Sequence, residues 1–533
     1  MRRIGPGVPG GVHRAEIAHV AQPDMHAEEG ARAGTGGGQG GVEACQHLGR
    51  LRLGIARGIG CGQSRKKDEV AMDDGQAASG AVGALHRQTF DHRSFSARQS
   101  ARVGDGTTHR RHAHPEAWWR ASSVASNLTE VTVPLLLADV RPLGAAATDV
   151  LLRDGRIAAV GKGVAADGAL RIEGRGRLLL PGLIEGHTHL DKTLLGLPWQ
   201  PHGAGPEVRD KIANERALRR QLHYHPGEQA ERQLARLVAA GTAHVRTHVD
   251  VDTEIGLAHV DALLAVRDAW RDRIDVEIVA FPQSGMLIRP GTLELLDRAL
   301  ALGCDLLGGL DPSAIDRDPK GHLDALFALA ERHGKGLDIH LHEPNELGAF
   351  ALDLIFERIA ATGMAGKVAV SHAFCLALPA EAGRDRLVEG LVRHDVAIVT
   401  TAPAGRPAPD MRLLARAGVR VAGGSDGCRD AWTPYGTTDM LERAALIGQR
   451  WNYRRDEDIA FALELMSGAA AAVLGLEDYG LDVGAVADLV LVDAETVAEA
   501  VVARPRRDLV VKRGRVVAGA ERGNMATVGG VAP

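Results

Sequence analysis

Short apolar runs alternate with longer amphipathic segments through the middle of the chain, between residues 178 and 480. The longer segments carry apolar residues at helical spacing, and five clear ones are 228–240, 259–271, 292–302, 323–333 and 411–417. The apolar runs have the length and composition of buried strands. They number eight: 178–189, 244–251, 276–283, 306–311, 337–343, 368–373, 396–402 and 419–426. Eight strands that alternate with helices predict an α/β fold, a (β/α)8 TIM barrel with its reactive groups at the carboxyl ends of the strands.

Both flanks of this region have a different pattern, in which short strand-like runs are separated by tight turns. On the amino-terminal side the runs are 131–136, 148–152 and 157–160, and on the other side they are 487–493, 509–512 and 516–517. Turns containing Gly155 and Gly514 are typical of hairpins. Because each flank is too small to fold alone, we expect the two to join into one small β-sandwich domain.

The first 125 residues show neither the helical nor the strand-like spacing of apolar residues. Nine of the 23 histidines lie there among glycines and arginines, without a repeated ligand spacing. We expect a disordered extension, either a targeting peptide or a stretch upstream of the true translation start. The predicted division is 1–125 for this extension, 126–178 with 481–520 for the sandwich, 179–480 for the barrel and 521–533 for a tail.

Composition narrows the class of protein. Of 533 residues, 45% are hydrophobic and 25% charged, and the net charge of -5 gives no reason to expect nucleic acid or a membrane as partner. A small-molecule substrate fits better. The five cysteines are scattered, and neither a membrane span nor a secretory signal is visible, so we expect a cytoplasmic protein without disulfides. A homo-oligomer is possible, but the sequence does not count subunits.

Polar residues gather where the predicted strands end, although an apolar barrel strand uses charge only at its mouth. The ends carry His187 and His189, His248 and Asp250, Gln283, His340 with His342 and Glu343, His372, and Asp426. Residues i and i+2 of a strand point to the same face, so His187 and His189 can hold one ion between them.

A His-x-His pair alone is a weak signal, but the other strand ends strengthen it. His340 would add a third nitrogen ligand and Asp426 an anionic oxygen, which makes a mononuclear site for one divalent metal ion, Zn or Fe(II). No lysine ends the fourth strand, which disfavours a lysine-bridged two-metal centre there. Such an ion lowers the pKa of water to about 7 and so supplies a nucleophile.

The remaining polar residues would move protons. Glu343 is the expected general acid/base. Strict strand alternation would place His342 on the same face as His340 and Glu343 on the other, so this role requires that the strand has ended and turned before Glu343. Asp426 and His372 would hold and relay the nucleophile. An equally good interpretation makes His372 a purely orienting group.

The sequence resembles the amidohydrolase superfamily, and within it the cytosine deaminases and the N-isopropylammelide amidohydrolase-like enzymes. The resemblance runs in order from about residue 130 to 518, and it rests on LPGLIEGHTHLDKT (180–193), RTHVDV (246–251), FPQ (281–283), Ser371-His372, GSD (424–426), Trp432 and PYG (434–436). It implies that His187, His189, His340 and Asp426 bind the metal, that Glu343, His372 and Asp426 are catalytic, and that Gln283 reads the amide edge of a pyrimidine. It also implies a sandwich built from both flanks.

Departures from that pattern concern the substrate. Cytosine deaminases carry an acidic residue directly after the metal-binding aspartate, whereas this chain has Gly427. They also lack the Asp311-Pro312 pair, and the residue that corresponds to His342 is acidic in them. A triazine, a pterin, a creatinine-like ring or another cyclic amidine therefore remains open.

Two further residues have competing interpretations. Trp432 is either a core residue or an aromatic wall for a planar substrate, and the resemblance favours the wall. His248 is either a substrate contact or, with Asp250, part of an outer shell.

We therefore predict a metal-dependent hydrolase of C–N bonds that deaminates a cyclic amidine. The first alternative is a cyclic amidase or an amidohydrolase that releases an N-alkylamine. The second is a non-catalytic binding protein that keeps the barrel.

Overall fold

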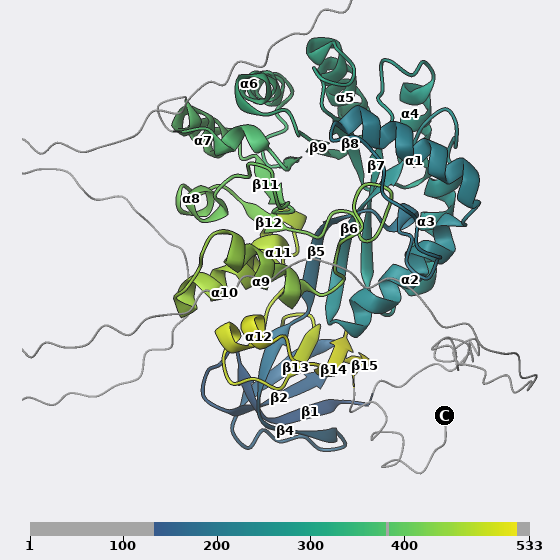
Figure 1. Cartoon of the computed structure of the whole chain (residues 1–533). Helices are drawn as coiled ribbons and strands as arrows, with labels where there is room; N and C mark the ends of the chain where they lie inside the picture. The colour runs from purple at the N-terminus through teal and green to yellow at the C-terminus, as the bar shows by residue number, and fades with distance from the viewer. Residues whose placement is uncertain (1–132, 380–382, 520–533) are drawn as a thin grey trace, which may run out of the picture. The chain divides into compact units, whose positions relative to one another are not determined.

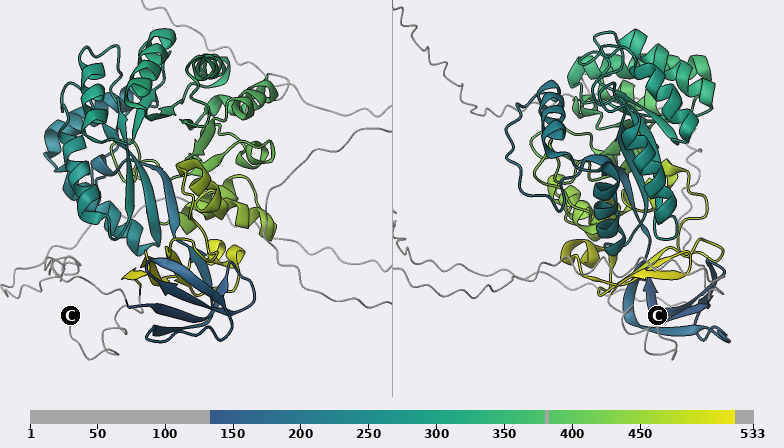
Figure 2. Two further views of the ribbon diagram at one scale, coloured as in Figure 1. Left: turned by 180° about the vertical axis from the view of Figure 1, so that it is seen from behind. Right: turned by 90° about the vertical axis from the view of Figure 1, so that its right-hand side faces the viewer.

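The computed structural model describes residues 133–379 and 383–519. The predicted extension 1–125 and the predicted tail 521–533 lie outside the described residues. Two sheets organise the described part, one of eight strands and one of seven. Figure 1 labels their elements, and Figure 2 shows the same ribbon from two further sides.

The eight-stranded sheet has the order β12-β11-β10-β9-β8-β7-β6-β5, and its paired strands are parallel. A parallel bridge between Thr188 and Asp426 links its first and last strands. This is the predicted (β/α)8 barrel. Its strands are β5 (Leu183–Thr188), β6 (Thr242–Asp250), β7 (Asp275–Phe281), β8 (Leu306–Leu310), β9 (Gly336–His340), β10 (Val368–Ser371), β11 (Ala397–Thr400) and β12 (Val421–Gly423).

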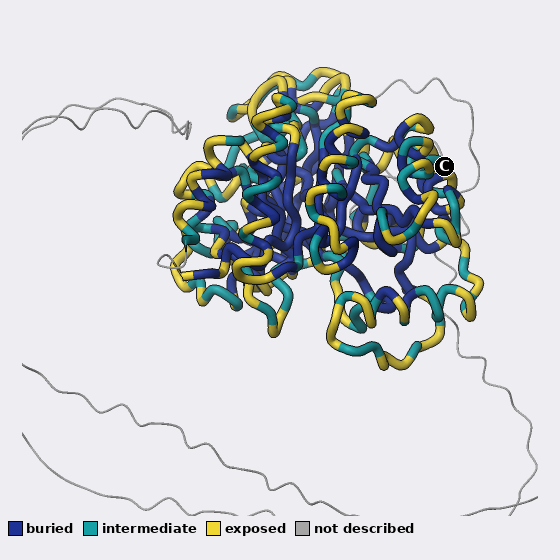
Figure 3. The backbone as a smooth tube through the Cα atoms, turned by 90° about the horizontal axis from the view of Figure 1, so that it is seen from above, coloured by how far each residue is buried: buried dark blue, intermediate teal, exposed yellow. Residues whose placement is uncertain are grey.

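Helices surround the strands (Figure 1), and the buried residues form the interior of the tube view in Figure 3. The five predicted helices are present within a few residues of their expected bounds. The helices are α1 (Val208–Leu222), α2 (Pro226–Ala239), α3 (Ala258–Trp270), α4 (Thr292–Leu302), α5 (Pro319–His333), α6 (Asn345–Thr362), α7 (Arg384–Arg393), α8 (Met411–Arg416), α9 (Met440–Arg450), α10 (Asp456–Glu464), α11 (Gly468–Leu474) and α12 (Val497–Ala503), with short 3-10 turns η3 (Leu190–Lys192) and η4 (Phe374–Ala377). None of the described helices is long and apolar enough to cross a membrane.

The seven-stranded sheet combines the two flanks of the chain. Its order is β15-β14-β13-β4-β1-β2-β3, and the flanks meet where β13 pairs antiparallel with β4. We propose to treat it as a separate small domain. Its strands are β1 (Leu135–Pro142), β2 (Thr148–Arg153), β3 (Arg156–Gly161), β4 (Leu170–Pro181), β13 (Leu489–Val492), β14 (Arg507–Lys512) and β15 (Arg515–Ala518).

The first predicted barrel strand, 178–189, is in fact two strands. Residues up to Pro181 belong to β4 of the small sheet, and β5 of the barrel starts at Leu183. Gly182 stands between them, where an added Cβ would meet the side chain of Ala243 at 2.6 Å. Only a glycine lets the chain pass between the two sheets at this close approach.

A buried lysine connects the small sheet to the amino-terminal end of the barrel. Lys512 is 1% exposed, and its Nζ donates to Asp275 Oδ2 at 2.7 Å, Asp488 Oδ2 at 2.6 Å and the carbonyl of Ala243 at 3.1 Å. Burial alone would raise the pKa of Asp488, but the hydrogen bond with His244 and the charge of Lys512 outweigh burial and lower it to about 2. Asp275 also pairs with Arg513, so Asp488 is the carboxylate that depends most on Lys512.

The variant Lys512→Met is expected to lower stability by about 3 kcal/mol or more, since it leaves a buried carboxylate without its counter-charge. Thermal unfolding followed by circular dichroism measures the effect as a fall in Tm. The control is Lys320→Met, which removes an exposed pair with Asp324 and should leave Tm nearly unchanged. Equal melting temperatures for the two variants would contradict the interpretation.

Candidate metal centre

Four histidines from three barrel strands meet at the carboxyl ends of those strands. His187 lies in β5, His189 directly follows it, His248 lies in β6 and His340 ends β9. One ring nitrogen of each can be chosen so that all four lie within 4.8 Å of one another. The pair predicted as one chelate and the predicted third nitrogen are therefore together.

Asp426 reaches the same cluster from the end of β12. Its Oδ1 lies 3.7 Å from His187 Nε2 and 3.4 Å from His189 Nε2, and its Oδ2 lies 4.0 Å from His372 Nε2. The bridge to Thr188 holds the aspartate there. Burial would raise the pKa of Asp426, yet the adjacent imidazoles of His187 and His189 hold it well below its usual range, so the carboxylate is anionic.

Hydrogen bonds fix which nitrogen of two imidazoles is free. Ser371 Oγ donates its only proton to Asp338 Oδ1 at 2.7 Å, so it must accept from His187 Nδ1, 2.9 Å away. His189 Nδ1 faces the carbonyl of His248 at 3.2 Å, which can only accept. In both rings Nδ1 carries the proton, and Nε2 presents its lone pair to the cluster, as metal ligation requires.

Several nitrogens of the cluster are buried without any partner. They are Nε2 of His187, both ring nitrogens of His248 and His340, and Nε2 of His372. Burial, followed by the neighbouring histidines, lowers the pKa of His340 and His372, so both rings are neutral. Unpartnered neutral nitrogens beside a carboxylate are the donor set that a divalent cation such as Zn or Fe(II) would satisfy, and so these residues fit a metal ion.

One carboxylate oxygen of Glu343 accepts hydrogen bonds from the backbone, and the other accepts none. Its Oε1 accepts from the backbone N–H groups of Ser313 and Ala314, at 2.7 Å each, while the buried Oε2 has no partner. Burial, helped by the charge of Asp311, raises the pKa of Glu343 to about 7. A carboxyl group with that pKa exchanges protons readily at neutral pH.

Gln283 is oriented by a lysine. Lys192 Nζ donates to Gln283 Oε1 at 2.6 Å and to Asp250 Oδ1 at 2.9 Å. Burial would lower the pKa of Lys192, but the charges of Asp250 and Glu215 outweigh burial and raise it, so the lysine is cationic. A cation that faces Oε1 leaves the amide NH2 of Gln283 as the group offered to a ligand.

The chain is similar to known enzymes. The sequence model described as the Amidohydrolase family matches residues 172–518. The crystal structure of N-isopropylammelide isopropylaminohydrolase from Burkholderia multivorans is 51% identical, with a TM-score of 0.70 over 73% of this chain and 98% of that one. N-isopropylammelide isopropyl amidohydrolase from Pseudomonas sp. (strain ADP) is 31% identical over 65% of this chain and 87% of its own length. The structure of 5-methylcytosine deaminase from Klebsiella pneumoniae with 5-fluorocytosine is 28% identical, with a TM-score of 0.64 over 72% and 97%.

The chain belongs to the amidohydrolase family. The predicted superfamily, the barrel fold and the predicted class of enzyme, a hydrolase of C–N bonds other than peptide bonds, are thereby confirmed. The family is metal-dependent, in agreement with the donor set. A purely binding role for this amidohydrolase has no support.

His248 and Trp432, two residues predicted to contact the substrate, differ in how deeply they are buried. His248 of the amidohydrolase is fully buried, with Nε2 3.5 Å from Asp338 Oδ1, and it belongs to the histidine cluster, whereas Asp250 pairs with Lys192. Trp432 is partly buried, its indole Nε1 donates to Glu215 Oε2, and Lys192 Nζ lies 6.0 Å from its ring centroid. The indole therefore stands beside the lysine that orients Gln283.

His342 is placed by the aspartate that ends the fourth strand. Asp311 Oδ1 accepts from the backbone N–H of His342 at 2.6 Å, and Oδ2 lies 2.8 Å from its Nδ1. The imidazole stacks on His372, with centroids 4.3 Å apart. Both departures from the cytosine deaminase pattern on these strands thus form one unit that supports His372.

Sequence reasoning missed three groups of this site: Lys192, Glu215 and Asp338. Lys192 was visible three residues after His189, but its partners Asp250 and Gln283 are 58 and 91 residues away along the chain. Glu215 lies on α1, which has no strong apolar periodicity and was not predicted. Only the folded chain reveals their proximity.

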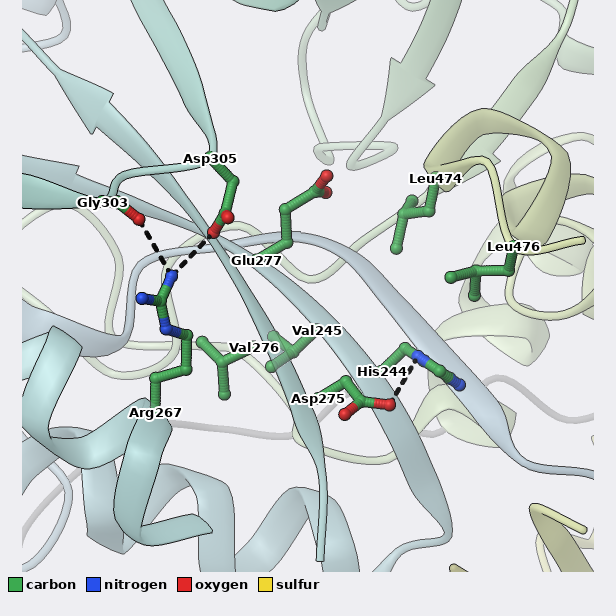
Figure 4. Close-up of a pocket in the computed structure, with 10 residues that line it drawn as sticks. All are labelled: His244, Val245, Arg267, Asp275, Val276, Glu277, Gly303, Asp305, Leu474 and Leu476. Carbon is green, nitrogen blue, oxygen red and sulfur yellow. Dashed lines mark hydrogen bonds and ion pairs between the residues drawn. The ribbon is translucent and has the colours of Figure 1, made fainter. Parts of the chain in front are cut away.

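A second group of possible ligands, His244, Asp275 and Asp488, lies at the amino-terminal ends of β6 and β7. It borders a cavity of about 440 Å³, shown in Figure 4, where Asp275 contacts His244 and Arg267 binds Gly303 and Asp305. Lys512 already donates to both aspartates of this group. Since a lysine supplies the cation, and since barrel chemistry belongs to the other end, we treat the group as structural.

Proposed function

We propose that the chain hydrolyses the exocyclic C–N bond of an oxygen-bearing nitrogen heterocycle, with release of an alkylamine from a triazine as the first candidate. The observation that carries the proposal is the convergence of unpartnered histidine nitrogens and Asp426, together with the hydrogen-bonded pair of donor side chains Lys192 and Gln283. Support for a triazine comes from the 51% identity to an N-isopropylammelide isopropylaminohydrolase over almost all of that enzyme.

The metal would be held by His187, His189, His340 and Asp426. When bound, a divalent cation supplies Lewis acidity that activates water and polarises the carbon under attack. The network that fixes the imidazoles, through Ser371, sets their orientation before any ion arrives.

Glu343 would carry the proton. Its free Oε2 accepts a proton from the attacking water, and the same carboxyl then donates it to the amine nitrogen as the C–N bond breaks. Anchoring Oε1 on Ser313 and Ala314 keeps the carboxyl in place during both transfers. His372, stacked on His342 and facing Asp426, would orient the nucleophile.

Donors rather than acceptors would read one edge of the ring. Lys192 and the amide NH2 of Gln283 both donate, so they suit a ring carbonyl oxygen or a lone-pair nitrogen. An N-alkylammelide, a triazine with oxygen substituents on two of its ring carbons, offers such an edge. The indole of Trp432 would stack on the flat ring.

A carboxylate occupies the space beside Gly427. A Cβ added to Gly427 would collide with Asp430 Oδ2. The other oxygen, Oδ1, accepts from the backbone N–H groups of Trp432 and Thr433 at 2.8 and 2.9 Å. We propose that Oδ2 accepts from a ring N–H of the substrate, so that Asp430 supplies the acidic group that is absent at position 427.

The variant Asp430→Asn is expected to lower kcat/KM by about ten- to a hundred-fold, the loss of one charge-assisted hydrogen bond. Gly427→Ala should give a similar loss with the carboxylate retained, because the new Cβ displaces Asp430. Steady-state kinetics on the metal-loaded protein measure both, with the exposed Asp456→Asn as control. Wild-type kinetics for both variants would remove Asp430 from the site.

The proposed reaction is tested by incubating metal-loaded protein with N-isopropylammelide, aminopyrimidines, pterin and creatinine, and identifying products by mass spectrometry. The expected result is isopropylamine together with the trihydroxy ring. Intact substrates throughout, with metal bound, would overturn the proposal.

Deamination with release of ammonia is the second candidate. It is favoured by Gln283 and by the 28% identity to a 5-methylcytosine deaminase. The same experiment distinguishes the two, since ammonia from an aminopyrimidine or a pterin would select deamination. Cleavage of a cyclic amide would instead open the ring and give a carboxylate.

A further inference from the structure

A cavity lined with arginines lies beside the proposed active site. It has a volume of about 520 Å³, and its walls come from α1 and from the segments that follow β7 and β8. The five arginines that line it are Arg209, Arg216, Arg220, Arg289 and Arg317. The first three lie on α1 at positions i, i+7 and i+11, so they share one helix face.

Positive charge in this cavity is poorly balanced. The carboxylate of Glu254 pairs with Arg216 and Arg220, at 2.7 Å each. Arg209 donates to the carbonyl of Ala314, and Arg289 Nε lies 3.4 Å from a carbonyl, contacts that leave both charges uncompensated. No acidic side chain lines the cavity among the described residues.

One donor of the cavity is buried without an acceptor. Nη1 of Arg216 has no hydrogen-bond partner although it is shielded from solvent. A buried guanidinium N–H that makes no hydrogen bond costs free energy. The acceptor that best matches the geometry of a guanidinium group is an oxyanion. The cavity is also large enough for a small molecule.

We propose that this cavity is a binding site for a small oxyanion, a phosphate or carboxylate group, separate from the metal centre. An apolar cluster contacts both sites: its members Ile212 and Ile315 line the cavity, and Phe281 stacks on His340. The inference does not depend on which heterocycle is hydrolysed.

The proposed anion site shares structure with the proton carrier. Arg209 binds the carbonyl of Ala314, whose backbone N–H donates to Glu343 Oε1. Ser284 lines the cavity and directly follows Gln283. An anion that orders the arginines would therefore steady the two segments that hold Glu343 and Gln283.

Calorimetric titration of inorganic phosphate into the full-length, metal-loaded protein tests the proposal at constant ionic strength, set with chloride. The test variant is R289Q/R317Q, since neither arginine has an acidic partner in the described structure and no carboxylate is left unpaired. We expect saturable binding that weakens about ten-fold or more in this variant, as for the loss of charge-assisted contacts.

Two controls locate the bound anion. Arg386→Ala, which removes an exposed arginine paired with Asp353, should bind phosphate like the wild type. His340→Ala should also retain phosphate binding, because the metal centre is not the proposed site. If His340→Ala were the only variant to lose phosphate binding, the anion would be assigned to the metal. Absence of saturable binding in wild type, or equal affinity in R289Q/R317Q, would overturn the proposal.

Kinetics distinguish a free anion from one carried by the substrate. If the oxyanion belongs to the substrate, phosphate inhibits competitively and R289Q/R317Q raises KM only for a ring that bears a carboxylate. If it is a separate ligand, phosphate is not competitive with a neutral ring. Failure of every substrate in the panel leaves the calorimetric result unaffected, so the two proposals fail independently.

Discussion

Replacing Glu343 by glutamine is expected to lower kcat about 10²- to 10⁴-fold without loss of bound metal. Glutamine keeps an oxygen for the N–H groups of Ser313 and Ala314, but it cannot take up and return a proton. Single-turnover kinetics with measurement of the released amine would show the fall in the chemical step. Metal analysis of the same sample shows that the centre is intact.

The matched control is Glu346→Gln, an exposed glutamate in the first turn of α6, which should keep wild-type kcat. A kcat for Glu343→Gln within a few-fold of wild type would remove Glu343 from its proposed role.

The pH dependence of kcat/KM should reflect the protonation of Glu343. Burial raises the pKa of Glu343 to about 7, and a general base must be deprotonated, so kcat/KM falls as the pH drops through that pKa. A bound cation favours the carboxylate, which moves the inflection to about 7 or below. In Glu343→Gln this acidic limb should be lost from the residual activity.

Removing the metal has the largest expected effect. Dialysis against a chelator should lower activity at least about 10³-fold, because water then lacks its activation, and added Zn or Fe(II) should restore it. In His340→Ala, added metal should fail to restore activity. Inductively coupled plasma mass spectrometry, alongside the amine assay, gives both quantities.

The control for this loss is His333→Ala. His333 lies on the outer helix α5 and pairs with Asp297, so this variant should retain metal and activity. Full activity of the chelated protein, or metal retained at wild-type stoichiometry in His340→Ala, would contradict the assignment.

The barrel could be predicted because its strands are buried on both faces and read as apolar runs, while its helices show the period of 3.6. The boundary at Gly182 could not, since β4 and β5 form one continuous apolar run and differ only in the sheet that each joins. Helix α1 was missed because it lies across the strand ends and has no continuous apolar stripe.

The cluster of candidate metal ligands could be predicted because the topology brings all strand ends to one place. The groups that hold the substrate in our proposal depend on contacts far apart in sequence, such as Lys192 with Gln283. Asp430 was hidden for another reason: only the backbone path around Gly427 brings its carboxylate beside that glycine. A glycine in a motif therefore signals a space that another side chain can fill.

The central claim is that one metal ion binds between His187, His189, His340 and Asp426. Anomalous diffraction from crystals grown with Zn tests it most directly. We expect a single strong peak about 2.0–2.2 Å from Nε2 of His187 and His189, a nitrogen of His340 and an oxygen of Asp426. An anomalous map without a peak at this position, or with its only peak between His244, Asp275 and Asp488, would contradict the claim.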